Sequence, residues 1–524
     1  MTIDASRTTC AREAAIAALL FLVCGAVFSS SFSYGFVSDD FGLLELRTWD
    51  QVWSHWKSVG FRRPLDEAFF FAFHRLFGYD PVPYRVFIFL VYGTNTYLVY
   101  RLARALTGRA GLGVLVAVFF AANTVQFRNV YWISCNLLVF ATAFFLVALL
   151  VFLRYLREGG QLWLALSFGL ALVGLLATKE DLVAFPVVAL VLSAHQILRT
   201  KRVLTWKDIA LIIRPTAIFW LIPVLYVGVR VALVAIVGGR EDCPYNLVAC
   251  FESHSDNPFR VDVLGIHAVE NLARHIFWNL GNLGAYWLDL AFSEYAGVFE
   301  WRKLGGAEYG IIVGFVAGLG TLYWVYRKRI SPWYFILGWA WFVATLLPTL
   351  AMPDHVYPYF SALSAVGLFL ALTMWLHAAT ERWSTKAARL GGTLLLGLFL
   401  ANSLYWTRAN ESVNVITTTS RLLQRLEVDL KRMYPAFPAG TTLVFPGIHS
   451  WFLGEGAALR VMYQDRPLTV LGQEMFAQGP GGFYATRKVD LRATATHVFV
   501  NTEEGLQEIT LEFFAVYRGE RVGT

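Results

Sequence analysis

The chain has 524 residues, of which 57% are apolar and only 15% are charged, whereas about a quarter of the residues of a soluble protein are charged. The mean hydropathy of +0.52 excludes an ordinary soluble enzyme. The net charge of +7 could attract nucleic acid, but the longest hydrophilic stretch, 406–524, carries twelve basic and twelve acidic residues. This stretch therefore offers no cationic surface to a nucleic acid.

Eleven apolar runs are each about long enough to cross a hydrocarbon layer of about 30 Å. They predict an α-helical polytopic membrane protein with spans at 12–33, 83–100, 111–125, 136–153, 162–177, 181–198, 209–236, 309–326, 333–350, 358–377 and 389–405. An alternative for the first run is a cleaved signal sequence, with Arg7 and Arg12 as its charged region.

Basic residues concentrate in every second loop between these spans. They include Arg101, Arg104, Arg109, Arg154, Arg157, Arg199, Lys201, Arg202, Lys207, Arg327, Lys328, Arg329, Arg382 and Lys386. Because Lys and Arg favour cytoplasmic loops, we expect a cytoplasmic N-terminus in an integral membrane protein. The odd number of spans then places the C-terminal segment outside, together with the long loops 34–82 and 237–308.

The hydrophilic C-terminal segment has the pattern of a small separate domain. Val413–Tyr434 reads as an amphipathic helix, and three short apolar runs bounded by Gly and Pro read as strands, at 441–446, 467–471 and 496–500. We therefore expect a transmembrane domain over 1–405 and a small extracytoplasmic α/β domain over 406–524. In the loop 237–308, apolar residues at helical spacing over 269–280 predict a helix at the outer interface.

Two adjacent carboxylates, Asp39 and Asp40, follow the first span on the outer side. Adjacent side chains point about 100° apart on a helix, so only one of the two can act as base in a given site. The other must orient, bind a metal or face water. An equal alternative is a helix N-cap, since an acidic residue at a helix start accepts backbone N–H bonds.

Two further charged elements lie at the outer boundary. Arg62 and Arg63 precede Pro64, and they are either an interfacial anchor for lipid headgroups or a forked contact for a phosphate. Lys179 and Glu180 occupy the short loop between the fifth and sixth spans. They are either a solvated turn or, since charge near hydrocarbon is costly, a functional pair.

Five cysteines in a chain of this length are not a disulfide framework. Cys243 and Cys250 lie in an outer loop, where an oxidising compartment would allow a disulfide between them. The sequence has no Cys-x-x-Cys, no His-x-x-x-His and no Gly-rich phosphate loop, so zinc sites and nucleotide-binding motifs of the usual kind have no support.

An ordered set of short motifs on the outer side identifies a resemblance. The motifs are Asp39-Asp40, Arg62-Arg63-Pro64-Leu65, Phe77-Gly78-Tyr79-Asp80-Pro81 with Tyr84, Tyr131-Trp132-Ile133-Ser134, Lys179-Glu180 and Pro186. The chain resembles the polytopic GT-C glycosyltransferases, in particular bacterial relatives of protein O-mannosyltransferases and of the tetratricopeptide-containing mannosyltransferases. The resemblance covers about residues 12–200, and 309–405 by topology only. Arg128 stands where these relatives often have Glu, which weakens the case for a second acidic ligand.

The resemblance implies an enzyme that moves a hexose or pentose from a polyprenyl-phosphate carrier to a protein, lipid or glycan acceptor, with inversion. It implies Asp39 as the first candidate for the base and Asp40 as the second. Candidates for the donor phosphate are Arg62, Arg63 and Lys179, and further donor or acceptor contacts are Glu180, His355 and Tyr357. A bacterial inner membrane would place the C-terminal domain in the periplasm.

Alternatives remain for both the cofactor and the function. No cofactor is required, although a divalent metal at Asp39 or Asp40 is possible, and no nucleic-acid partner is expected. A glycan polymerase or ligase would carry similar outer arginines. A transporter or lipid flippase would instead have polar residues and broken helices at mid-membrane, whereas the acids here cluster at the outer boundary.

Overall fold

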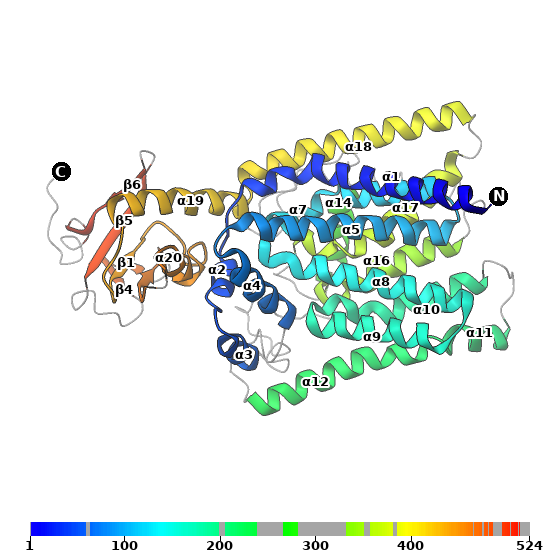
Figure 1. Ribbon diagram of the computed structural model, residues 1–524, viewed down its shortest axis with the longest axis horizontal. Helices are drawn as coiled ribbons and strands as arrows, with labels where there is room; N and C mark the ends of the chain where they lie inside the picture. The colour runs from blue at the N-terminus through cyan, green and yellow to red at the C-terminus, as the bar shows by residue number, and fades with distance from the viewer. Residues whose placement is uncertain are drawn as a thin grey trace.

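The computed structural model describes residues 2–58, 63–198, 205–237, 266–280, 332–350, 357–380, 385–464, 466–473, 476–479, 482–485, 495–502, 505–511 and 513. Within them the chain forms a bundle of long helices with a small α/β domain at one end (Figure 1). The N-terminus lies at the opposite end of the bundle. We call the end that carries the C-terminal domain the outer end, after the predicted topology.

Ten of the eleven predicted spans coincide with helices. These are α1 (Thr2–Phe28), α5 (Pro81–Thr107), α6 (Ala110–Ala121), α8 (Asn136–Glu158), α9 (Gln161–Ala177), α10 (Phe185–Leu198), α11 (Trp206–Ile213) with α12 (Leu221–Val237), α16 (Pro332–Leu350), α17 (Ser364–Thr380) and α18 (Thr385–Val413). The predicted span 309–326 lies outside the described residues. Among the described residues, six helices are long and apolar enough to cross a membrane, or up to eight if each of two bent pairs is one span.

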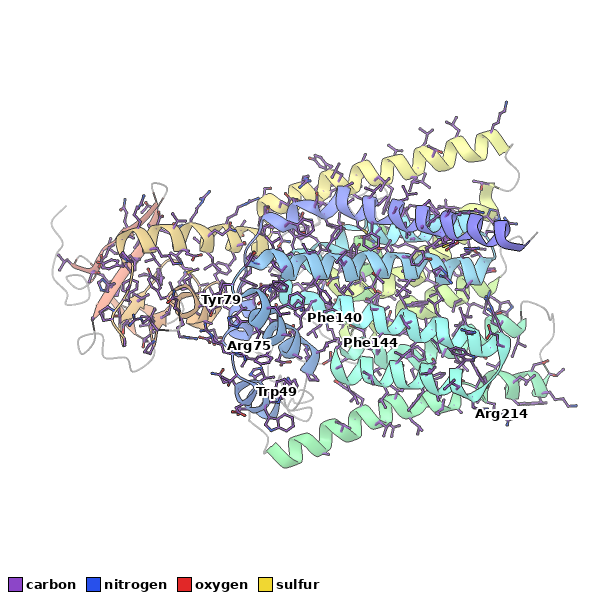
Figure 2. All side chains as sticks on the ribbon, viewed as in Figure 1. Trp49, Arg75, Tyr79, Phe140, Phe144 and Arg214 are labelled. Atoms are coloured by element: carbon purple, nitrogen blue, oxygen red, sulfur yellow. The ribbon has the colours of Figure 1, made fainter. Side chains whose placement is uncertain are left out.

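The two bent pairs correct the simple picture of straight crossings. Helix α6 is followed after a break by a segment, Thr124–Tyr131, that turns away by 51°. The break falls at Asn123, whose side chain accepts from the Val125 N–H and so starts the new segment. Helices α11 and α12 are bent by 52°. Arg214, in the predicted seventh span, is exposed at this bend, and Figure 2 places it at the end opposite the C-terminal domain.

The predicted basic loops meet at the end of the bundle where the chain begins. Arg104 pairs with Glu13 of α1, and Arg157 donates to the Ala105 carbonyl. Tyr334 of α16 donates to the Leu106 carbonyl at 3.0 Å. Among the described residues, the basic loops after α5 and α8 therefore lie at the same end of the bundle as the start of α1, as predicted.

Close helix packing fixes the bundle. Helices α16 and α17 cross at Gly338 and Gly367, where a Cβ on either residue would lie 2.5 Å from the other's carbonyl oxygen. Helix α14 (Ile266–Leu280), predicted at the outer interface, packs against the end of α16, where Asn271 donates to the Leu350 carbonyl at 3.1 Å. These contacts hold the outer ends of the spans in fixed positions.

The first outer loop forms three short helices at the outer end: α2 (Asp39–Leu44), α3 (Trp49–Ser58) and α4 (Pro64–Phe77). Aromatic contacts join them, for example between Trp49 and Phe71, whose ring centroids are 5.7 Å apart. Figure 2 labels Trp49 and Tyr79 in this layer, between the bundle and the C-terminal domain. These short helices thus separate the transmembrane bundle from the C-terminal domain, and α2 contacts that domain.

The C-terminal domain follows the last span without a linker, since only Asn414 separates α18 from α19 (Val415–Met433) and caps α19. The predicted strands are confirmed as β1 (Thr442–Val444), β2 (Thr469–Leu471) and β5 (Thr496–Thr502), with β6 (Gly505–Glu508) at the edge. The sheet order is β2-β1-β5-β6, parallel except for the β5–β6 pair. A hairpin of β3 (Phe476–Gly479) and β4 (Gly482–Ala485) and the short helix α20 (Ala457–Met462) complete it.

Candidate functional site

The acidic pair opens helix α2 at a strained turn. Ser38, directly before the pair, has a positive φ of 46°, which a non-glycine residue rarely adopts. This turn sends the two carboxylates in different directions: Asp40 is fully buried, whereas Asp39 is exposed. Strain of this kind persists where the surrounding structure holds it in place, and such places are often functional sites.

Asp40 is tied to the main chain on both of its oxygens. The Val37 N–H donates to Oδ2 and the Ser134 N–H donates to Oδ1, each at 2.8 Å. Burial raises the pKa of Asp40 to about 7, while these N–H bonds and the nearby Arg85 act in the opposite direction. With both oxygens engaged, Asp40 joins the first outer loop to the segment before α8.

Arg85, near the start of α5, is the second buried charged residue that links main-chain segments of this site. Its guanidinium donates to the carbonyls of Tyr34 and Gly35, each at 2.6 Å, and of Tyr131 at 2.8 Å. Arg85 was not among the site residues predicted from the sequence. The signal was nevertheless present, since a charged residue inside an apolar run is usually paired or functional.

Asp39 faces the C-terminal domain. Ser38 Oγ donates to Asp39 Oδ1 at 3.2 Å, and the side chain of Trp451 also hydrogen-bonds to Asp39. Although one edge of the carboxylate is open, protein surrounds its other sides, and this desolvation raises its pKa. Glu455 raises the pKa further, whereas the hydrogen bonds from Ser38 and Trp451 and the charge of Arg63 oppose the rise.

The residues of the C-terminal domain that cover Asp39 belong to the segment 449–456, which we call the roof loop. Trp451 packs edge-on against Trp132, with the ring centroids 5.9 Å apart. Gly454 has a φ of +56°, and a Cβ there would lie 2.7 Å from the Ser38 carbonyl oxygen. Arg460, just after the loop, pairs with Glu45 of the first outer loop at 2.5 and 3.1 Å.

Three cations gather beside the acidic pair, around Tyr359 of the segment that leads into α17. The Arg128 guanidinium lies 5.5 Å from the Tyr359 ring centroid, and the Lys179 ammonium lies 5.7 Å from it. Arg63 interacts electrostatically with both Tyr359 and Lys179. Burial lowers the pKa of Lys179, and the charge of Arg63 lowers it further, although neighbouring acids oppose this.

The acids and the cations lie around one common neighbour, the thiol of Cys135. Cys135 is buried and lies within electrostatic reach of Asp39, Asp40, Arg128 and Lys179. The structure therefore brings together groups from the first outer loop, the broken span and the turn between α9 and α10. Arg128, which in the sequence only weakened the case for an acidic ligand, belongs to the cationic cluster.

Acidic neighbours accompany the cations. Glu180 lies in the 3-10 turn Glu180–Ala184 and attracts Arg63. Asp66, in the first turn of α4, is buried and also attracts Arg63. Burial and the adjacent Glu67 raise the pKa of Asp66 well above its usual range. The sequence showed no signal for Asp66 beyond its position after Arg63.

The remaining predicted residues have different outcomes. Tyr357 packs under the Arg128 guanidinium, with 4.8 Å between the guanidinium carbon and the ring centroid. Arg62, His355, Cys243 and Cys250 lie outside the described residues. Among the described residues, no three His, Cys, Asp or Glu side chains are grouped to hold a metal ion, and a metal at Asp39 or Asp40 stays a prediction.

Comparison with known proteins finds similarity among solved structures but not among protein families or curated proteins. No protein-family model matches the chain, and no curated protein matches it. Among solved structures, it is similar to the crystal structure of ArnT from Cupriavidus metallidurans in the apo state, with 12% sequence identity and a TM-score of 0.44. The match covers 90% of this chain and 86% of that one.

Proposed function

We propose that the protein is an integral membrane glycosyltransferase that moves a sugar from a polyprenyl-phosphate carrier to an acceptor hydroxyl at the outer face. The observation that carries this proposal is the juxtaposition of one open carboxylate, Asp39, with the cations Arg63, Arg128 and Lys179 at the outer end of an apolar bundle. A donor with a lipid tail and a phosphate headgroup needs cations at this depth, and the acceptor hydroxyl needs a base.

The cations suit the donor phosphate. When the glycosidic bond to the phosphate oxygen breaks, that oxygen gains negative charge, which fixed cations in a site of low dielectric stabilise. Arg63 and Arg128 carry forked guanidinium groups, and Lys179 adds a point charge. The Nε of Arg63 is buried and makes no hydrogen bond to the described residues, so it is available to a phosphate oxygen.

Asp39 suits the role of base. It takes the proton of the acceptor hydroxyl as the hydroxyl oxygen forms its bond to the anomeric carbon and the phosphate leaves from the opposite side. One such displacement inverts the anomeric configuration. A base must be deprotonated yet basic enough to accept a proton, and the raised pKa of Asp39 favours the second requirement.

Asp40 and Arg85 suit a positioning role. Each oxygen of Asp40 and each nitrogen of the Arg85 guanidinium already has a main-chain partner, so the fold holds both side chains in place. They connect the start of α2 to Ser134 and Tyr131, next to the cations. Their effect is to fix the distance between base and phosphate site.

The remaining parts of the proposal follow the family resemblance. The sugar is a hexose or pentose, the acceptor is a protein, lipid or glycan, and the membrane is the bacterial inner membrane with the C-terminal domain in the periplasm. A glycan polymerase or ligase is the nearest alternative, and a transporter or flippase is the more distant one. The location of Asp39 at the outer end, under a folded domain, supports chemistry at the membrane surface over transport.

The experiment is sugar transfer by the full-length protein in lipid nanodiscs. Wild type, Asp39→Asn and the control Asp50→Asn, which removes an acid from α3 of the same loop, are given a panel of polyprenyl-phosphate sugars and a membrane extract as acceptor source. We expect release of polyprenyl phosphate with wild type and Asp50→Asn, and loss of at least a hundredfold with Asp39→Asn. Full activity of Asp39→Asn would overturn the assignment of the base. A parallel series with a chelator tests the metal.

A further inference from the structure

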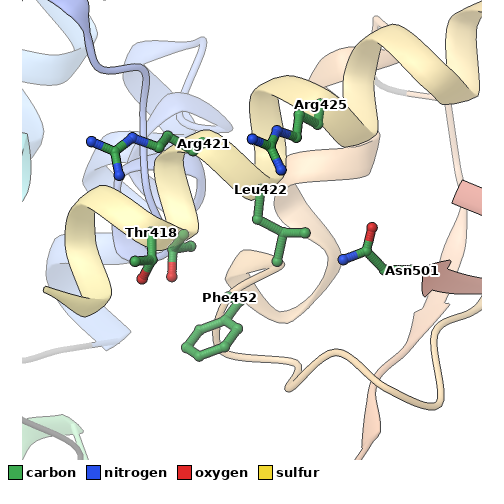
Figure 3. A pocket seen from close by; sticks show the side chains of 7 residues that line it. Thr418, Arg421, Leu422, Arg425, Phe452 and Asn501 are labelled. Carbon is green, nitrogen blue, oxygen red and sulfur yellow. The ribbon is translucent and has the colours of Figure 1, made fainter. Parts of the chain in front are cut away.

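An open pocket lies between helix α19 and the rest of the C-terminal domain (Figure 3). Its volume is about 400 Å³, within the range of about 300–1,000 Å³ typical of small-molecule sites. Arg421 and Arg425 line it from α19, Phe452 lines it from the roof loop, and Asn501 lines it from β5. None of these residues is a member of the acidic pair or of the cationic cluster.

The two arginines have no carboxylate partner among the described residues. Arg421 donates to the Tyr34 hydroxyl at 2.7 Å and lies over the Tyr34 ring, so its partner is neutral. Arg425 is exposed and makes no hydrogen bond or ion pair within the described part of the chain. Like charges four residues apart on a helix repel each other, and a bound anion would relieve this repulsion.

The nearest acid on the same helix face is already engaged. Asp429 follows Arg425 by four residues and borders the adjoining groove. Its Oδ1 accepts from Arg432 at 3.0 Å, and its Oδ2 accepts from the Leu506 N–H at 3.3 Å. Asp429 therefore holds β6 to α19 instead of neutralising Arg425.

The pocket adjoins the roof loop that covers Asp39, because Phe452 belongs to that loop. Phe452 faces the pocket, while its neighbour Trp451 hydrogen-bonds to Asp39. On the other side, Arg421 contacts Tyr34, whose carbonyl accepts from Arg85. The pocket therefore borders the roof loop and contacts, through Arg421, the segment that leads into the acidic pair.

We propose that this pocket is the acceptor subsite and that it binds an anionic group, a phosphate or a carboxylate, carried by the acceptor. The inference rests on the proposed function and names the chemical class of its acceptor. Arg421 and Arg425 pair with the anion through forked guanidinium contacts, Asn501 and Thr418 supply neutral hydrogen bonds, and the Phe452 ring covers an apolar face of the attached sugar or lipid group.

The anion has two possible sources, a membrane-anchored acceptor or a soluble one. Only Asn414 separates α19 from α18, the last membrane helix, so a membrane-anchored headgroup is a source to be tested beside a solute. Binding assays separate the two sources. Protein in phosphatidylcholine nanodiscs is titrated with glucose 6-phosphate, with glucose as neutral comparison, and a second preparation contains phosphatidylglycerol. Thermal stability is followed in each case.

The variants are Arg425→Gln and the matched control Arg432→Gln, which removes the same charge from the same helix at the pair with Asp429. We expect stabilisation by glucose 6-phosphate, by phosphatidylglycerol, or by both, in wild type and Arg432→Gln. In Arg425→Gln we expect the affinity for the anion, taken from the ligand concentration needed for stabilisation, to fall about tenfold, as for the loss of one charge-assisted contact. No stabilisation by either anion, or equal stabilisation of both variants, would overturn the subsite.

Kinetics separate this inference from the proposed function. With an active acceptor, Arg425→Gln should raise the KM for the acceptor about tenfold and leave kcat and the KM for the donor unchanged. An unchanged acceptor KM in an active enzyme overturns the subsite and leaves the transferase standing. Anion binding that depends on Arg425 in a protein that transfers no sugar supports the anion site and counts against the transferase.

Discussion

The hydrogen bond between Trp451 and Asp39 makes the proposed base sensitive to a residue more than 400 positions away. Trp451→Phe removes the indole N–H, the one hydrogen-bond donor of that side chain, and keeps an aromatic ring against Trp132. Because the bond favours the charged carboxylate, its loss raises the pKa of Asp39. The base is then protonated up to a higher pH, so the acid limb of the pH profile should move upward.

The size of this effect follows from the environment of the bond. A hydrogen bond to a charged group is worth about 1.5–3 kcal/mol net, and we use about 1 kcal/mol because Asp39 is open to solvent on one edge. This corresponds to about a fivefold loss of kcat/KM on the acid limb and to no loss on the alkaline plateau. The contribution of the bond is thus present only where Asp39 titrates.

The assay is donor turnover measured from about pH 4 to pH 9 for wild type, Trp451→Phe and the control Trp206→Phe. Trp206 is 85% exposed and starts α11 at the other end of the bundle. Superimposable profiles for wild type and Trp451→Phe, or a loss of the same factor at every pH, would refute the reasoning. Superimposable profiles would mean that the hydrogen bond does not affect the pKa of Asp39. A loss of the same factor at every pH would mean that Trp451 has a purely structural role.

Three other substitutions test the site and its support. Asp40→Asn should destabilise the protein by about 2 kcal/mol, because the amide NH2 meets one of two backbone N–H donors; an unchanged thermal midpoint in detergent would contradict this. Arg128→Gln should raise the KM for the donor about tenfold, whereas Arg154→Gln, at an exposed pair far from the site, should not; equal donor KM values would remove Arg128 from the phosphate site. Gly454→Ala should lower both the thermal midpoint and transfer more than Gly440→Ala, since both residues have positive φ but only Gly454 lies against a neighbouring backbone atom; equal losses would mean that the roof contact contributes nothing.

Much of the fold was predictable because membranes impose a simple rule on sequence. A crossing needs about 20 apolar residues, and ten of the predicted spans coincide with helices. The bends were not predictable, because apolar content alone does not distinguish a straight helix from one that breaks at Asn123. The strands of the C-terminal domain were visible because Gly and Pro bound them.

In the candidate site, too, some residues could be predicted from local sequence signals and others could not. Asp39, Arg63 and Lys179 stood out because charge at a membrane boundary is costly. Trp451 did not stand out, since nothing in a chain of 18 tryptophans marks the one that folds back onto Asp39. In the sequence, Arg128 was noted only because it stands where relatives often have Glu. Its position beside Tyr357 and Tyr359 depends on the bend at Asn123, which the sequence did not predict. Long-range contacts, rather than local pattern, decide these roles.

The contact between Glu45 and Arg460 joins positions 415 residues apart, and this separation has a consequence for biosynthesis. At about 5–20 residues per second, a ribosome needs on the order of 20–80 s to make the second residue after the first. Throughout that interval the acidic pair is already synthesised while the segment that covers it is not. A nascent or prematurely terminated chain can therefore hold its first helices in the membrane while the acidic pair is still uncovered, and the contact with Glu45 forms only after Arg460 has been made.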